Sequence, residues 1–126
     1  MAHSPEEWLI QAEYDLETAE FMLSGGRNIY AVFMVHLSIE KALKGIYQKK
    51  FNEVPPRKHS LIYFVNKVEI VPPDNIGKFL VKLDQASVAT RYPEDLLRLL
   101  GAYTQDATKE IFIHARETLK WVKKIF

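Results

Sequence analysis

Residues 29–46 read IYAVFMVHLSIEKALKGI, and this stretch decides the fold. At the 100° step of an α-helix its apolar side chains form two stripes on opposite sides. The stripes are Tyr30, Phe33, Met34 and Leu37, and Val32, Val35, Ile39, Ala42, Leu43 and Ile46. A helix that is apolar on two sides is typical of the centre of a helical bundle. We therefore predict a central helix over residues 29–50, capped at its start by Asn28.

The segments on either side of this stretch also have helical spacing. A helix over residues 5–24 is indicated by the capping sequence that begins at Ser4 and by Gly25-Gly26 at its end. Further helices are predicted over 60–69 (with Ser60 as the cap), 74–89 and 103–125, with a short helical turn over 94–100. The residues expected to be buried in the last helix are Ala107, Ile111, Ala115, Thr118, Val122 and Ile125. Since no segment alternates as a strand does, the predicted fold is an all-α, up-and-down bundle of four to five helices.

The composition indicates one packed domain spanning residues 1–126. Of the 126 residues, 48% are hydrophobic and 12% aromatic, which is ample for one core, whereas the chain is too short for two comfortable ones. The absence of cysteine excludes a disulfide framework, a thiolate zinc site and a cysteine nucleophile. Glycine-rich phosphate loops, zinc-protease motifs, calcium loops and nucleophile elbows are absent too.

Signals for export or for a membrane span are missing from the sequence. The N-terminus has no basic region followed by an apolar one. The most apolar run, residues 29–39, is well short of the roughly 20 residues that a membrane span needs. We therefore expect a cytoplasmic protein without membrane contact.

The net charge of +1 conceals an uneven distribution of charged residues. Residues 1–40 hold seven acids and one base, and residues 41–67 hold seven bases and one acid, so their balances are −6 and +6. The remaining residues, 68–126, hold nine bases and eight acids. This pattern excludes a histone-like polycation and allows a basic patch in the middle of the chain.

Three histidines outside the N-terminal tail are candidates for chemistry. His36 and Glu40 stand four residues apart, and two ligands do not make a metal site, so a local side-chain bridge is the favoured interpretation. His114 lies on the predicted buried stripe of the last helix and is expected to be a hydrogen-bonded core residue. His59 ends a basic, proline-rich loop, where ligand binding and helix capping stay equally open.

Several cations are candidates for holding an anion. Lys41 and Lys44 lie one turn apart on the same side of the central helix, so a phosphate could bridge them. The guanidinium of Arg91 could hold phosphate or carboxylate with two hydrogen bonds. Alternatively, the lysines form a solvated face whose positive charge balances the acidic first helix. An equally open alternative for Arg91 is a structural role, in which it ties its loop to helix carbonyls or to an acid. Glu40 followed by Lys44 is the favourable order for an ion pair along a helix.

The sequence resembles the HEPN domain family over nearly its whole length. Two blocks of the central helix carry the resemblance, Tyr30-Ala31-Val32-Phe33 and Ile39-Glu40-Lys41-Ala42-Leu43-Lys44-Gly45. The His59-Ser60-Leu61 start of a helix and the Arg91-Tyr92-Pro93 loop match the family pattern in the expected order. The spacing of Trp8, Ala12, Asp15-Leu16 and Ala19 is similar to that of the family's first helix.

The resemblance implies a five-helix bundle that forms a homodimer. Small members of the family are often encoded beside a minimal nucleotidyltransferase, as a two-component, toxin–antitoxin-like pair. Other members are metal-independent ribonucleases with an arginine four to six residues before a histidine. No such pair occurs in this chain, and its nearest imitation is Lys109 before His114.

The leading hypothesis from the sequence is therefore a non-catalytic subunit without metal or cofactor. It would bind a nucleotidyltransferase partner and offer Lys41, Lys44, His59 and Arg91 to a nucleotide, RNA or another polyanion. The first alternative is a ribonuclease toxin with a degenerate catalytic site at Lys109 and His114. The second is a purely structural oligomerisation bundle.

Overall fold

The computed structural model describes residues 4–91, with the side chain of Arg91 excepted, and residues 96–126. In these ranges the chain forms six helices and no strand, which confirms the all-α prediction. The helices are α1 (Pro5–Ser24), α2 (Asn28–Phe51), α3 (Leu61–Val68), α4 (Asp74–Arg91), α5 (Leu96–Ala102) and α6 (Gln105–Ile125). The number exceeds the predicted four to five because the expected turn over 94–100 is a separate two-turn helix, α5.

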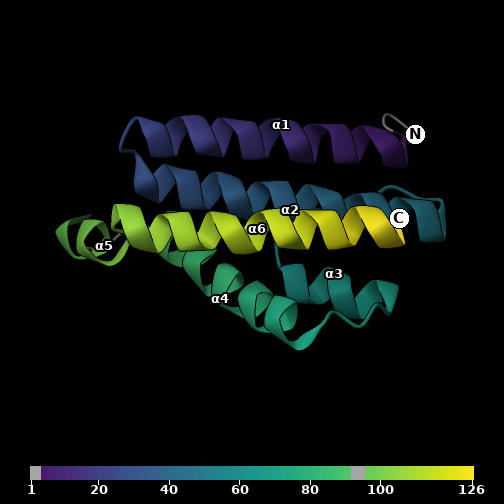
Figure 1. The fold of residues 1–126 in the computed structure, drawn as a ribbon. Coiled ribbons are helices and arrows are strands. Elements are labelled where there is room, and N and C mark those ends of the chain that lie inside the picture. Colours follow the sequence, from purple (N-terminus) through teal and green to yellow (C-terminus); the bar gives the residue numbers. More distant parts are fainter. Residues whose placement is uncertain (1–3, 92–95) are drawn as a thin grey trace.

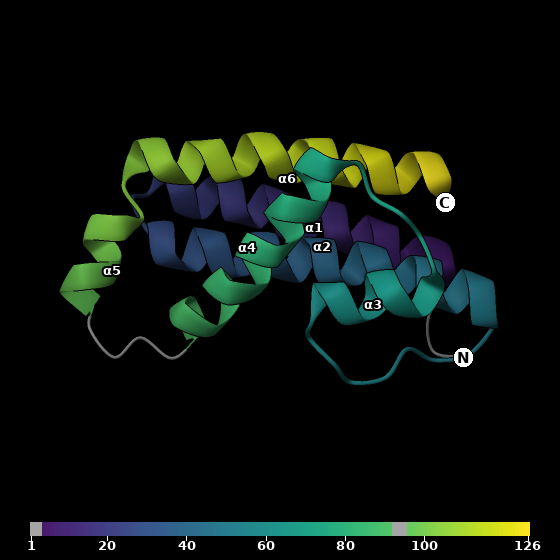
Figure 2. The ribbon, with the colours of Figure 1, turned by 90° about the horizontal axis from the view of Figure 1, so that it is seen from below.

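Helices α1, α2 and α6 run side by side along the long axis of the molecule (Figure 1). Helices α3 and α4 pack on the opposite face of α2, as the view from below shows (Figure 2). Helix α5 lies at one end of the bundle, next to the start of α6. Each of the other five helices contacts α2, which confirms its predicted central position. Only one of its two apolar stripes is fully buried, because Tyr30 is exposed and Phe33, Met34 and Leu37 are partly buried.

The predicted capping of α1 and α3 is confirmed. The Ser4 hydroxyl accepts a hydrogen bond from the Glu7 N–H at 3.2 Å, and the Ser60 hydroxyl accepts one from the Tyr63 N–H at 3.1 Å. After α1, Gly26 has a φ of +77°, a left-handed conformation that glycine adopts at little cost. Local sequence signals therefore define these helix ends.

The prediction that Asn28 caps α2 is wrong. The cap position is Arg27, and its side chain makes no capping hydrogen bond. Asn28 lies inside the helix and donates its side-chain N–H to the carbonyl of Tyr103 at 2.9 Å. Its side chain thus ties the start of α2 to the segment between α5 and α6, while its Oδ1, the atom that would cap a helix, accepts no hydrogen bond from the described residues.

The buried face of α6 is rotated from the predicted one. Ala115, Thr118 and Val122 are buried as expected, whereas Ala107 and Ile125 are exposed and Ile111 is only partly buried. The other buried residues are Thr108, Phe112 and Leu119. Each lies one position after a residue of the expected stripe. Successive residues are 100° apart about the helix axis, so positions one residue further along lie on a neighbouring side of the helix. That side carries Phe112 and Leu119, which are part of the core.

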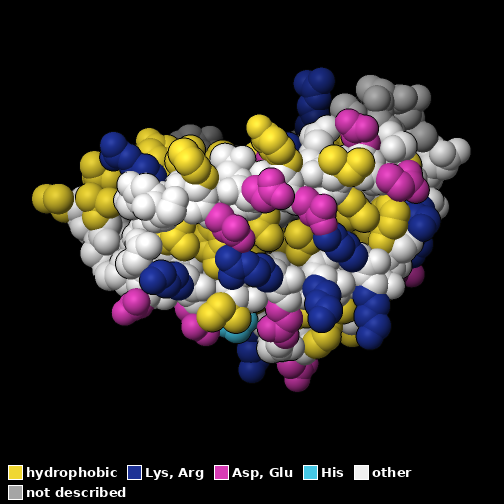
Figure 3. Space-filling view, turned by 45° about the horizontal axis from the view of Figure 1, so that its top comes forward, with side chains coloured by type: hydrophobic (Ala, Val, Ile, Leu, Met, Phe, Trp, Pro, Cys, Tyr) yellow, Lys and Arg dark blue, Asp and Glu magenta, His cyan; other side chains and the backbone are white. Residues whose placement is uncertain are grey.

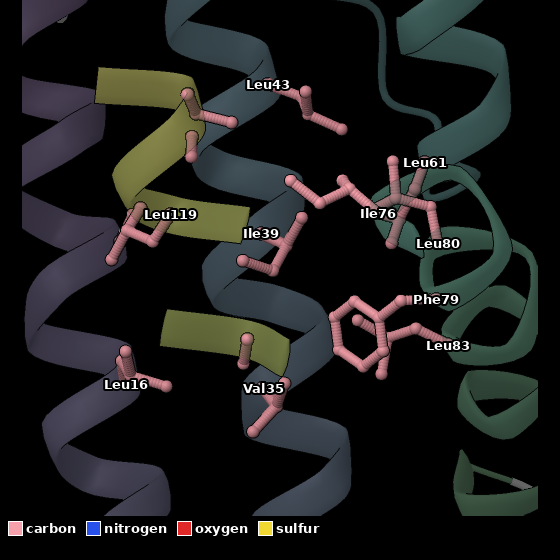
Figure 4. Packing of buried hydrophobic residues seen from close by; sticks show 14 of the residues in the cluster. Leu16, Val35, Ile39, Leu43, Leu61, Ile76, Phe79, Leu80, Leu83 and Leu119 are labelled. Carbon is pink, nitrogen blue, oxygen red and sulfur yellow. The ribbon is translucent and has the colours of Figure 1, made fainter. Parts of the chain in front are cut away.

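The core forms on both sides of α2. Ile39 and Leu43 lie between Leu119 of α6 on one side and Ile76 and Leu80 of α4 on the other (Figure 4). Near the end of α2, Gly45 allows a close approach of α1. A Cβ at Gly45 would lie 3.1 Å from both the Pro5 carbonyl oxygen and Trp8 Cβ.

No helix in the described parts of the chain is long and apolar enough to cross a membrane.

Candidate functional site

A buried polar network joins α2 to the start of α3 and to α4. We call it the Glu40 network; its members are His36, Glu40, Lys44, His59 and Asp84. The Glu40 side chain is only 3% exposed, and its two oxygens face three basic groups. Lys44 Nζ lies 3.0 Å from Oε2, His59 Nδ1 lies 3.2 Å from Oε1, and His36 Nδ1 lies 3.8 Å from Oε1. The predicted ion pair between Glu40 and Lys44 is thus confirmed, as is the predicted bridge between His36 and Glu40.

Asp84 of α4 completes the network and also caps α3. Its Oδ1 is 3.0 Å from His36 Nε2, and its two oxygens accept hydrogen bonds from the N–H groups of Leu61 (2.9 Å) and Ile62 (3.1 Å). Ser60 also donates its hydroxyl hydrogen to Oδ2 at 3.2 Å. Burial alone would raise the pKa of the Asp84 carboxyl, but the hydrogen bonds from His36 and from the two backbone N–H groups outweigh it and lower that pKa. Asp84 is therefore an ionised cap that ties three helices together.

Asp84 is a site residue that the sequence pattern did not predict. The only local signal is its position four residues after Leu80, at the edge of the apolar stripe of α4. An acid at that position is also common on a solvated helix edge, so its contact with the start of α3 became visible only from the fold.

The two predicted anion-binding lysines of α2 both face carboxylates of the chain itself. Lys44 is buried against Glu40 and lies 5.6 Å from the ring centre of Phe64. Lys41 Nζ lies 2.9 Å from Oδ2 of the buried Asp15 of α1. That oxygen accepts no hydrogen bond of normal geometry within the described residues, so Lys41 neutralises it as a nearby charge. A phosphate bridging Lys41 and Lys44 would have to displace both partners.

His59 lies at the rim of the Glu40 network. Its side chain is 56% exposed, so one ring nitrogen faces the buried Glu40 while the rest of the ring is accessible. The preceding loop residues Arg57 and Lys58 are exposed, and Lys58 Nζ lies over the Tyr63 ring at 4.3 Å. The fourth candidate, Arg91, is the last residue of α4; its side chain, Tyr92 and Pro93 lie outside the described residues.

The expectation that His114 is a buried core residue is wrong. Its side chain is 38% exposed, with Nε2 3.4 Å from a Glu110 oxygen and the ring 5.5 Å from that of Phe79. It lines a cavity of about 290 Å³ between α4 and α6. This follows from the rotation of α6, which brings Phe112 and Leu119 into the core and leaves Ala107 and Ile125 exposed. Lys109 is exposed and does not line the cavity.

Metal binding finds no support in the geometry of the described side chains. Within residues 4–91 and 96–126, no three histidine or carboxylate side chains lie close enough together to hold a metal ion. In the Glu40 network, Lys44 Nζ and the N–H groups that begin α3 occupy the positions next to the carboxylates.

Two of the six acids of α1 form ion pairs with α6. Glu20 pairs with Arg116 at 2.8 Å, and Glu13 pairs with Lys123. Acidic side chains and basic ones accordingly run in adjacent bands on this face (Figure 3). Four of the seven acids in residues 1–40 are thus paired within the described chain, whereas only Lys41 and Lys44 among the seven bases of residues 41–67 are paired with a side-chain carboxylate there.

Comparison with known proteins assigns this all-α bundle to a family. The HEPN domain family model matches residues 5–125, and the chain belongs to the HEPN family. It is similar to the crystal structure of ST0689, an archaeal HEPN homologue, with 31% identity, 97% of each chain covered and a TM-score of 0.76. It shares its fold with TT1696 from Thermus thermophilus, at 22% identity, 97% and 98% coverage and a TM-score of 0.82. No curated protein matches the chain.

Proposed function

We propose that this HEPN protein is a non-catalytic, homodimeric subunit of a cytoplasmic two-component system of the toxin–antitoxin type. It binds a minimal nucleotidyltransferase protein and a nucleotide or other polyanion such as RNA. One observation carries the proposal: no arginine stands four to six residues before a histidine in this sequence, so the pair expected of a HEPN ribonuclease is missing.

The contacts of the candidate residues support a division of labour among them. Lys41 and Lys44 are held by Asp15 and Glu40, so their role in the proposal is to shape the surface beneath the ligand. His59 is the exposed member of the network, and the neighbouring Arg57 and Lys58 form no ion pair with a carboxylate of the described residues. We place the anion at this loop, with Arg91 as a further contact.

The ribonuclease alternative draws on the exposed position of His114. A histidine at a cavity of about 290 Å³ is better placed for chemistry than one in the core. Lys109, however, is five residues away, about 140° around the helix, and lies outside the cavity lining. Lysine also lacks the planar fork with which arginine would hold a phosphodiester. We therefore favour the non-catalytic proposal over the ribonuclease.

Isolation of the native complex, followed by mass spectrometry, tests the partner. The proposal expects a small nucleotidyltransferase in stoichiometric amount, encoded by the neighbouring reading frame. Recovery of the homodimer alone, together with calorimetry that detects no binding of ATP, GTP or oligonucleotide RNA, would contradict the proposal. That result would favour the alternative of a purely structural oligomerisation bundle.

The anion site is tested separately with matched lysine and arginine variants. Arg57→Ala/Lys58→Ala and Arg91→Ala should each weaken nucleotide binding at least about tenfold, because each removes a charged contact. Lys67→Ala/Lys78→Ala removes two exposed cations elsewhere and should leave binding unchanged. Purified protein should leave tRNA and mRNA intact; cutting that His114→Ala abolishes would establish the ribonuclease instead.

A further inference from the structure

The outer face of α1 carries large apolar side chains that no other part of the described chain covers. Ile10, Tyr14 and Phe21 are 64%, 70% and 76% exposed. With Glu17 they follow one another at spacings of four, three and four residues, so all four lie on one stripe about 16 Å long. Hydrophobic side chains stand out among acidic ones on this face (Figure 3). A stripe of this kind on a folded protein marks an interaction surface.

The charges around the stripe separate into two groups. Asp15, Glu13 and Glu20, on the flanks of α1, are neutralised within the chain by Lys41, Lys123 and Arg116. Glu17, on the stripe, and Glu6 and Glu7, at its N-terminal end, form no ion pair with the described residues. At the other end of the stripe, just after α1, Arg27 is exposed and likewise lacks an ion pair there. The stripe is thus acidic at one end and basic at the other.

This order of side chains is complementary to itself. If two α1 helices pack antiparallel about a two-fold axis between positions 15 and 16, each residue i faces residue 31−i of the second copy. Ile10 then faces Phe21, and Tyr14 faces Glu17, whose carboxylate can accept the phenol hydrogen bond. The acidic start of each helix lies beside the turn that carries Arg27 of the other copy. Self-complementarity of one patch is what a two-fold interface requires.

The large apolar side chains of the stripe supply about half of the area that such an interface needs. At roughly 100–180 Å² for each, Ile10, Tyr14 and Phe21 contribute on the order of 450 Å². A stable interface needs about 800 Å² from each partner, with a polar rim that Glu17, Glu6, Glu7 and Arg27 can provide.

We propose that the α1 stripe is the surface through which two copies of this chain pair, antiparallel and in the register i to 31−i. The proposal rests on the homodimer named under the proposed function and specifies its interface. The nucleotide and nucleotidyltransferase parts of that function are tested by other measurements, so either can fail without the other.

Sedimentation velocity on the purified chain tests the surface. Wild type should be a dimer, and Phe21→Asp should raise the dissociation constant of the dimer at least about 30-fold, because it places a charge in both of the symmetric contacts between Ile10 and Phe21. Ile113→Asp is the matched control; Ile113 is 55% exposed on α6 and should leave the dimer intact. Both side chains are exposed, and circular dichroism checks that both variants fold.

Crosslinking tests the register. Because the chain has no cysteine, single cysteines can be placed without background. A short bis-maleimide should join Ile10→Cys to Phe21→Cys in a mixture of the two variants, and should join neither to Ile113→Cys. A monomer at all concentrations, or a dimer that Phe21→Asp leaves unchanged, overturns the proposal; in the second case the homodimer stands and its surface lies elsewhere.

Discussion

The carboxylates of α1 and those of the Glu40 network are neutralised in two different environments. Glu13 and Glu20 pair with α6 at the surface, where all four side chains are between 44% and 54% exposed. Glu40 and Lys44 are 3% and 11% exposed, and His36 is 1% exposed. Exposed pairs contribute about 0–1 kcal/mol because water solvates the separated charges nearly as well. When a buried pair loses one partner, the other charge remains where water cannot reach it. Removal of one partner should therefore lower the free energy of unfolding much more in the Glu40 network than at the surface of α1.

The largest effect is expected at Glu40. Glu40→Ala should lower the free energy of unfolding by about 3–5 kcal/mol, because Lys44 remains buried without its carboxylate. Urea denaturation followed by circular dichroism measures this loss, and Glu13→Ala on α1 is the matched control, with an expected change below about 1 kcal/mol. Glu40→Gln keeps the side-chain volume and separates the charge effect from the cavity. Similar losses for Glu40→Gln and Glu13→Ala would remove the distinction between the two regions.

Asp84 should rank second and bring a pH dependence. Asp84→Asn should cost about 2–3 kcal/mol, since the amide cannot accept all the hydrogen bonds from Leu61, Ile62 and His36. The folded-state pKa of Asp84 is lowered relative to an unfolded value of about 3.9, so its contribution is complete above that pH and disappears as the pH falls through the folded value.

Urea midpoints measured between pH 7 and pH 2.5 check this sign. The gap between wild type and Asp84→Asn should narrow as the pH falls below about 4. Asp74→Asn, at the exposed start of α4, provides the control. A gap that widens in acid would contradict the lowered pKa.

The pair of Lys41 and Asp15 should fall between the two regions. Lys41 is 22% exposed and Asp15 only 8%, so Lys41→Met leaves one mostly buried carboxylate without its cation. We expect a loss of about 1–2 kcal/mol in the free energy of unfolding, measured as above. Lys78→Met, at an exposed position of α4, shows the cost of a surface lysine. Equal losses in the free energy of unfolding for the two variants would show that Asp15 behaves energetically like the surface carboxylates.

The smallest effect is expected at the pairs between α1 and α6. Arg116→Ala should cost less than about 1 kcal/mol, and 1 M NaCl should remove most of the difference from wild type. Thermal melts at low and high salt measure both. A larger, salt-independent loss would show that these pairs hold α6 in place as firmly as the Glu40 network holds α3 and α4.

Contacts within one helix could be predicted from the sequence, and contacts between helices could not. The pair of Glu40 and Lys44 and the bridge from His36 to Glu40 follow from four-residue spacing, which places two side chains on the same side of a helix. His59 and Asp84 reach the same network from 19 residues after Glu40 and 48 residues after His36. No spacing rule connects positions so far apart, so the contacts of His59 and Asp84 with this network could not be predicted, although His59 itself was a candidate.

The sequence by itself determined the helical class, the central position of α2 and the ends of most helices, because caps, glycines and apolar periodicity act within a few residues. Tertiary structure alone decided which way α6 faces, and so moved His114 out of the core and Phe112 into it. Apolar residues on three sides of α6 allow more than one buried face, and the choice depends on the volume that α1, α2 and α4 leave between them. It likewise decided that Lys41 and Lys44 face carboxylates of the chain, because long-range charge pairing is settled by which helices become neighbours.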